Sequence, residues 1–98
     1  MILPLHDIKT QILQFFADKP VQKVWLFGSY ARGDADDESD IDVLVDIEKG
    51  AKVGMRYYIW HEELSEIFNK KVDIVSHGWE NKFMKPFIDK DKTLIYEK

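Results

Sequence analysis

"LFGSYARGDADDESDIDVLV", residues 26–45, decides the fold, because it joins two buried strands through a glycine turn and an acidic loop. The strand before the turn is VQKVWLF (21–27), whose β-branched and aromatic side chains are typical of a buried strand. Gly28 ends that strand and permits a tight turn. Ser29 is predicted to cap a short helix over residues 30–32, which Gly33 breaks.

The acids that follow the turn are arranged on a strand. IDVLVDI (41–47) predicts a second, mostly buried strand, and a period of two places Asp40 and Asp42 on the same face. Two neighbouring carboxylates are costly unless a cation neutralises them, and oxygen ligands favour Mg²⁺ or Mn²⁺. The amides after Gly28 stand at a helix start, which suits phosphate. An ordinary turn or solvated acids would explain either feature alone, but together they predict a metal-bound nucleoside triphosphate.

The rest of the chain alternates helices with strands. A first helix, from residue 5 to about residue 17, is predicted from one apolar stripe, formed by Leu5, Ile8, Ile12, Phe15 and Phe16. A longer helix over residues 55–69 is predicted from a second stripe, formed by Tyr57, Trp60, Leu64, Ile67 and Phe68. KKVDIVS (70–76) and TLIYE (93–97) predict two more strands. Between them a last helical face, delimited by Pro86, is predicted from Trp79, Phe83, Phe87 and Ile88. This order predicts an α/β layered sheet in a single domain over residues 1–98.

Charge and composition exclude several classes of protein. The net charge is −4, yet residues 34–48 hold eight acids and no base, and the remainder is net positive. Such dense negative charge disfavours direct binding of nucleic acid. No apolar run approaches the ~20 residues of a membrane span, and the start of the chain does not resemble a secretory signal. With no cysteine, the chain suits a reducing compartment, and a cytoplasmic protein is expected.

The same stretch resembles the signature of the nucleotidyltransferase superfamily that includes DNA polymerase β. That signature is Gly-Ser, ten residues, then Asp-x-Asp, and it matches Gly28-Ser29 and Asp40-Ile41-Asp42 without a gap. The length and element order resemble the minimal nucleotidyltransferases (MNT) of prokaryotes. The resemblance implies a nucleotidyltransferase fold of α/β (α+β) class, with a small mixed β-sheet and helices packed on one face.

The resemblance also implies roles for six residues. Asp40 and Asp42 would bridge two Mg²⁺ ions, for which Mn²⁺ is a possible substitute. Asp73, in KVDIV, would be a third metal ligand and a base towards the attacking hydroxyl. Gly28 and Ser29 would hold the triphosphate of ATP. Arg32 would neutralise phosphate charge, although an ion pair with a neighbouring acid explains Arg32 equally well.

The acceptor is expected to be another protein, because 98 residues leave no room for an acceptor-binding domain. Minimal nucleotidyltransferases of this type resemble the antitoxin half of two-gene modules whose other half is a HEPN-domain ribonuclease toxin. This implies a hetero-oligomer in which AMP passes from ATP to a tyrosine of the toxin. The alternative is a non-catalytic nucleotide-binding module that neutralises its partner by contact. Transfer to a small molecule is disfavoured. The pair Lys70-Lys71 could approach the triphosphate, but it is interpreted as a solvated turn. Tyr57, Trp60 and Phe68 are interpreted as core residues rather than as a surface on which a base stacks.

Overall fold

The computed structural model describes residues 2–98. Four helices and four strands alternate along the chain in the predicted order. They are α1 (Leu5–Phe16), β1 (Val21–Phe27), α2 (Gly28–Arg32), β2 (Ile41–Ile47), α3 (Arg56–Phe68), β3 (Val72–Ser76), α4 (Lys85–Asp91) and β4 (Thr93–Glu97). Within residues 2–98, none of the helices is long and apolar enough to cross a membrane.

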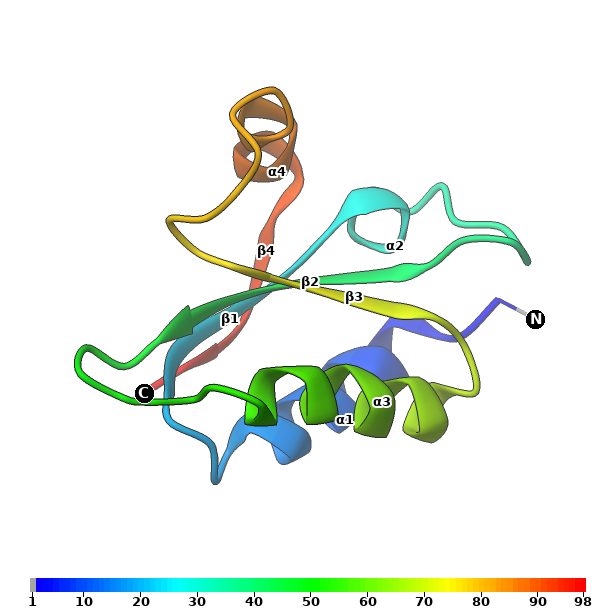
Figure 1. The fold of residues 1–98 in the computed structure, drawn as a ribbon. Helices are drawn as coiled ribbons and strands as arrows, with labels where there is room; N and C mark the ends of the chain where they lie inside the picture. The colour runs from blue at the N-terminus through cyan, green and yellow to red at the C-terminus, as the bar shows by residue number, and fades with distance from the viewer. Residues whose placement is uncertain (1) are drawn as a thin grey trace.

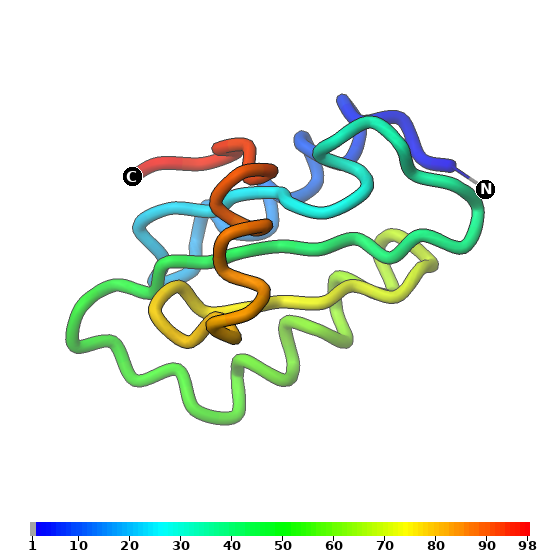
Figure 2. Tube along the Cα trace, turned by 90° about the horizontal axis from the view of Figure 1, so that it is seen from above, coloured from blue at the N-terminus to red at the C-terminus, as the bar shows by residue number. Residues whose placement is uncertain are grey.

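The strands form one mixed sheet in the order β3-β2-β1-β4. β1 runs antiparallel to β2 and β4, whereas β2 and β3 are parallel. Figure 1 shows α1 and α3 side by side against one face of this sheet, while α4 stands over the opposite face. Seen from above in Figure 2, the segment that contains α4 crosses over the strands. The predicted small mixed sheet is confirmed, but the helices are not all on one face, because α4 packs opposite α1 and α3.

The main core lies between the sheet and the helices α1 and α3. Alternate residues of the strands point into it, so that Val24, Leu26, Ile41, Val43 and Val45 are all fully buried. Opposite them pack Ile8, Ile12 and Phe16 of α1 and Trp60, Leu64 and Phe68 of α3. Trp60 and Phe68 are therefore core residues, as predicted. Leu5 and Ile67, expected on the same stripes, are exposed, because the buried side of each helix is narrower than the pattern suggested.

A smaller apolar cluster lies on the other face of the sheet, where Phe27, Leu44 and Ile88 are buried together. Only Ile88 of the predicted last helical face contributes to it, and the prediction for Trp79, Phe83 and Phe87 is wrong, because all three are exposed. The cause is the position of Pro86 in the first turn of α4. The helix begins at Lys85, so Trp79 and Phe83 precede it and share no helical face with Ile88.

Candidate active site

Three carboxylates from separate parts of the chain meet on the sheet face that α1 and α3 leave uncovered. Asp42 and Asp73 are direct partners in the parallel pairing of β2 with β3. Asp40 immediately precedes β2, two residues from Asp42. The ammonium of Lys71 lies 3.9 Å from an oxygen of Asp40 and 3.8 Å from an oxygen of Asp73. Acids 33 residues apart in the sequence, Asp40 and Asp73, thus share one cation.

The glycine turn lies beside one of these carboxylates, that of Asp42, on the side away from β3. The residue paired with Asp42 in β1 is Phe27, so the turn at Gly28 follows directly beside Asp42. Gly28 has a φ of +76°, which disfavours any other residue. A Cβ at this position would lie only 2.3 Å from Oδ2 of Asp42. The backbone therefore approaches the carboxylate as closely as only glycine allows.

The electrostatics of the cluster are centred on Asp42. Burial raises the pKa of Asp42 from 3.8 to about 6, and the charges of Asp73 and Asp40 add to this effect. The positive charges of Arg32 and Lys71 act in the opposite direction, but the net effect is unfavourable to the ionised carboxylate. A site that concentrates negative charge beyond what its own cations neutralise is suited to bind an additional cation.

The donor set fits a hard divalent ion. In the part of the chain from residue 2 onward, no group of three or more His, Asp or Glu side chains is arranged so that the protein alone could hold a metal ion. The three aspartates nevertheless offer only oxygen atoms, and Mg²⁺ uses one or two carboxylates together with substrate phosphates rather than a complete protein cage. Asp40, Asp42 and Asp73 are therefore the residues that would hold such an ion.

Ser29 lies within the first turn of α2 rather than before it. The helix starts at Gly28, its N-cap is Phe27, and no side chain caps it, so the predicted capping role of Ser29 is wrong. The backbone carbonyl of Ser29 instead accepts hydrogen bonds from the N–H groups of Gly33 (3.0 Å) and Asp34 (3.1 Å). Gly33 ends the helix with a φ of +86°, as predicted. Without a capping role, the hydroxyl of Ser29 remains available to a ligand.

Arg32 links α2 to α4. Its Nη1 donates to Oδ2 of Asp91 at 2.8 Å and its Nε donates to Oδ2 of Asp34 at 3.1 Å. These two carboxylates raise the pKa of the Arg32 guanidinium. The ion pair that the sequence left open as an explanation of Arg32 is therefore present, and its main partner comes from a distant part of the chain. Arg32 also lines, with Gly28, Ser29 and Asp42, a cavity of about 280 Å³.

Lys70 and Lys71 have structural partners that the sequence did not reveal. Lys70 donates to the backbone carbonyls of Asp37 (3.0 Å) and Ser39 (2.9 Å), so it fixes the acidic loop, while Lys71 reaches the carboxylates described above. The pair lies in the connection between α3 and β3, and the Lys71 side chain is 68% exposed, as a solvated turn implies, but both lysines also contact the segment that leads into β2. Only the parallel register of β2 and β3 brings the two lysines to the start of β2, and no local pattern in the sequence shows that register.

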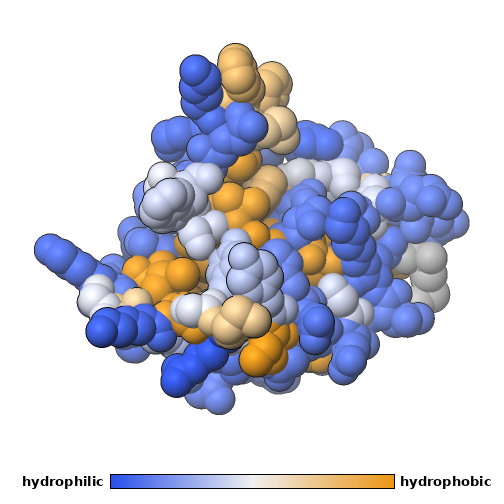
Figure 3. Space-filling view, viewed as in Figure 1, coloured by the Kyte–Doolittle hydropathy of each residue, from blue (hydrophilic) through white to orange (hydrophobic). Residues whose placement is uncertain are grey.

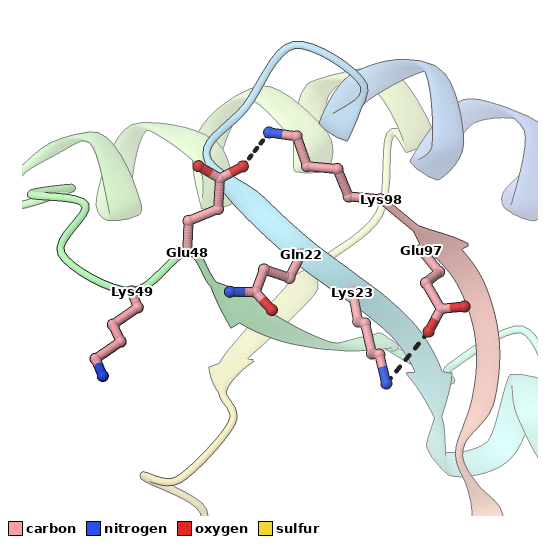
Figure 4. Close-up of a pocket in the computed structure, with 6 residues that line it drawn as sticks. All are labelled: Gln22, Lys23, Glu48, Lys49, Glu97 and Lys98. Carbon is pink, nitrogen blue, oxygen red and sulfur yellow. Dashed lines mark hydrogen bonds and ion pairs between the residues drawn. The ribbon is translucent and has the colours of Figure 1, made fainter.

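A wider hollow, of about 490 Å³, lies elsewhere on the molecule, where β1 begins and β4 ends (Figure 4). Charged side chains line it, and two ion pairs cross it, Lys98 with Glu48 and Lys23 with Glu97. It has neither a cluster of carboxylates nor a glycine turn. Its size alone does not make it a better candidate than the smaller cavity beside Asp42.

Comparison with known proteins places the chain in a family. The sequence profile of the family described as "Polymerase beta, Nucleotidyltransferase" matches residues 10–98. The chain belongs to this nucleotidyltransferase family. The "Putative protein adenylyltransferase MJ0128" of Methanocaldococcus jannaschii is 35% identical to this nucleotidyltransferase over 97 residues, which are 97% of this chain and 96% of the relative.

Two further proteins extend the comparison. The "Protein adenylyltransferase MntA" of Thermococcus cleftensis is 36% identical over 55 residues, which cover 56% of this nucleotidyltransferase and 54% of MntA. The solved complex of a tri-AMPylated HEPN toxin with the MNT antitoxin of Shewanella oneidensis contains a chain with a TM-score of 0.74 and 16% identity. The match covers 97% of this nucleotidyltransferase and 74% of that chain, and it shows a common fold.

Proposed function

We propose that this chain is a minimal nucleotidyltransferase domain over residues 1–98 that transfers AMP from ATP to a tyrosine hydroxyl of a HEPN-domain toxin. As the antitoxin, it would form a hetero-oligomer with that toxin in the cytoplasm, without direct contact with nucleic acid. The observation that supports this most is the pairing of Asp42 with Asp73 beside Gly28. The names of the relatives and of the neighbouring complex support the acceptor, because they describe protein adenylyltransferases and an AMPylated HEPN toxin.

Each residue of the site has a role in this proposal. Asp40, Asp42 and Asp73 would hold two Mg²⁺ ions, for which Mn²⁺ could substitute. When bound, the metal would neutralise charge on the phosphates and on the leaving group. Gly28 lets the backbone approach the β and γ phosphates, and Ser29 donates its hydroxyl to a phosphate oxygen. Arg32 lines the same cavity and contributes positive charge next to them.

The reaction is an in-line displacement at the α phosphorus of ATP. The acceptor oxygen forms a bond to this phosphorus, the bond from the phosphorus to the bridging oxygen of the β phosphate breaks, and pyrophosphate leaves. Asp73 would accept the proton of the hydroxyl, and its place on the edge strand β3, with a side chain that is 44% exposed, supports this role. The pKa of about 6 means that Asp42 is mainly ionised above that pH, which is the form that binds a cation.

The experiment is to incubate the full chain with Mg²⁺, ATP and the product of the adjacent gene, and to measure the mass of that product. We expect a gain of one or more AMP units on a tyrosine. Asp42→Asn should abolish the gain, while Asp46→Asn, the same change on the same face of β2 but outside the cluster, should leave it intact. If Asp40→Ala and Asp42→Ala still neutralise the toxin as well as the natural protein, neutralisation occurs by contact and the enzymatic proposal is wrong.

A further inference from the structure

The segment before and within α4 exposes an unusual amount of apolar surface close to the candidate site. Trp79, Phe83, Met84 and Phe87 are 86%, 73%, 51% and 63% exposed. In Figure 3 the orange shades of apolar side chains are visible in the α4 region at the top of the molecule, among the blue of hydrophilic ones. A contiguous group of exposed large apolar side chains usually marks a surface that binds something.

Two of these side chains, Met84 and Phe87, also line the cavity of about 280 Å³ described above. The glycine turn and a carboxylate, in the form of Gly28, Ser29 and Asp42, line the same cavity. Met84 further lines an adjoining cavity, of about 320 Å³, that reaches both Asp42 and Asp73. The two cavities share Asp42 and Met84 in their linings, so one hollow is bordered by the carboxylates, the glycine turn and an apolar wall.

The apolar wall is held in a fixed place. Ile88, the residue after Phe87, is buried against Phe27 and Leu44 of the sheet. At the end of α4, Asp91 accepts the 2.8 Å hydrogen bond from Arg32, and the side chain of Asp91 is mostly buried. At the start of α4, the backbone carbonyl of Asn81 accepts hydrogen bonds from the N–H groups of Met84 and Lys85, both at 2.9 Å. Met84 and Phe87 are thus presented by an anchored helix, although their own side chains are exposed.

We propose that Met84 and Phe87 form the wall that binds the nucleobase of the triphosphate. This inference rests on the proposed function. A nucleotide has a charged end and a flat apolar end, and the hollow has the same two-part character. Base stacking on an aromatic side chain tolerates any base, because every base has a π face, and the sulfur of methionine also packs well on aromatic rings. Stacking on this wall favours the larger purine ring over a pyrimidine.

The test compares ligands with and without a base, measured by calorimetry on the full chain in the presence of Mg²⁺. The ligands are ATP, CTP and inorganic tripolyphosphate. For Phe87→Ala we expect the affinity for ATP to fall about 5- to 150-fold, with the affinity for tripolyphosphate unchanged and the preference for ATP over CTP reduced. Phe87→Tyr, which keeps the ring, should bind ATP as the natural protein does. Tyr58→Ala is the matched control, since Tyr58 of α3 is as exposed as Phe87 but lines neither cavity.

Each contrary result has a distinct meaning. If Phe87→Ala binds ATP normally, or loses ATP and tripolyphosphate equally, the proposed wall is wrong even though the triphosphate site stands. If Phe87→Ala binds ATP normally but no longer forms the complex with the partner, the apolar surface is a protein-docking site instead. If neither ATP nor tripolyphosphate binds the natural protein, or Asp42→Asn does not weaken either ligand, the triphosphate site itself fails and the proposed function fails with it.

Discussion

Asp42→Asn is expected to stabilise the folded protein while removing its activity. The raised pKa means that the ionised carboxylate is less favourable in the folded chain than in the unfolded chain. A rise from 3.8 to about 6 corresponds to at most ~3 kcal/mol, since a tenfold change in proton affinity is worth about 1.4 kcal/mol. Asp42 is only partly buried, so solvent screening reduces the expected gain to on the order of 1–2 kcal/mol. Asparagine has a similar shape and no charge.

The pH dependence follows from the sign of this effect. Above pH 6, Asp42 is ionised in both states and the natural protein carries the full penalty. As the pH falls from about 6 to 4, the folded state takes up a proton before the unfolded state does, so the penalty disappears. The free energy of unfolding of Asp42→Asn should therefore exceed that of the natural protein at pH 7.5 and equal it near pH 4.

Urea unfolding with EDTA present, followed by circular dichroism at several pH values, measures this difference directly. In a separate thermal melt at pH 7.5, the midpoint temperature of the variant should lie roughly 4 °C or more above that of the natural protein. Asp46→Asn is the control for a general effect of removing one negative charge from β2. A variant that is less stable at pH 7.5, or whose difference from the natural protein does not change with pH, would refute the electrostatic account of this site.

Three other predictions concern the same region. Gly28→Ala should abolish AMP transfer and cost on the order of 1–3 kcal/mol in urea unfolding, because its Cβ meets Asp42; Gly33→Ala, with a similar φ but open space around a Cβ, should lose stability yet keep activity. Arg32→Gln and Asp91→Asn should be coupled in a double-mutant cycle of unfolding, and strictly additive losses would contradict the link from α2 to α4. Mg²⁺ at ten times its dissociation constant should stabilise the natural protein by about 1.4 kcal/mol in thermal melts but leave Asp42→Asn unchanged.

The sequence was most informative for strands in which the two-residue period of apolar side chains matches burial on one face of the sheet. In β2, Ile41, Val43 and Val45 point into the core and fix the phase of the strand. That phase places Asp42 on the opposite face without any knowledge of the rest of the fold. The pairing with Asp73 could be suggested only by the family resemblance, because parallel register depends on contacts between distant residues.

The tail of the chain was predicted less well, and the reason is physical. Trp79 and Phe83 have the composition of a core helix, but apolar side chains serve a binding surface as readily as a core. Their spacing carries information only within one continuous helix, and the start of α4 at Lys85 removes that condition. The contact of Lys71 with Asp40 was missed for a related reason, since Asp40 lies across the pairing of β2 with β3 and far from Lys71 in the chain.

The alternation of side chains along β2 bears on how this protein can change over time. Under the proposed function, exchange of Asp42 would silence the chemistry but leave Ile41 and Val43 in place, so an inactive descendant would keep its shape. Insertion or deletion of one residue at the start of the strand would instead disrupt the fold, because it would turn the aspartates into the core and the isoleucine towards solvent. Substitutions can therefore accumulate on this strand, whereas its length is far less free to vary.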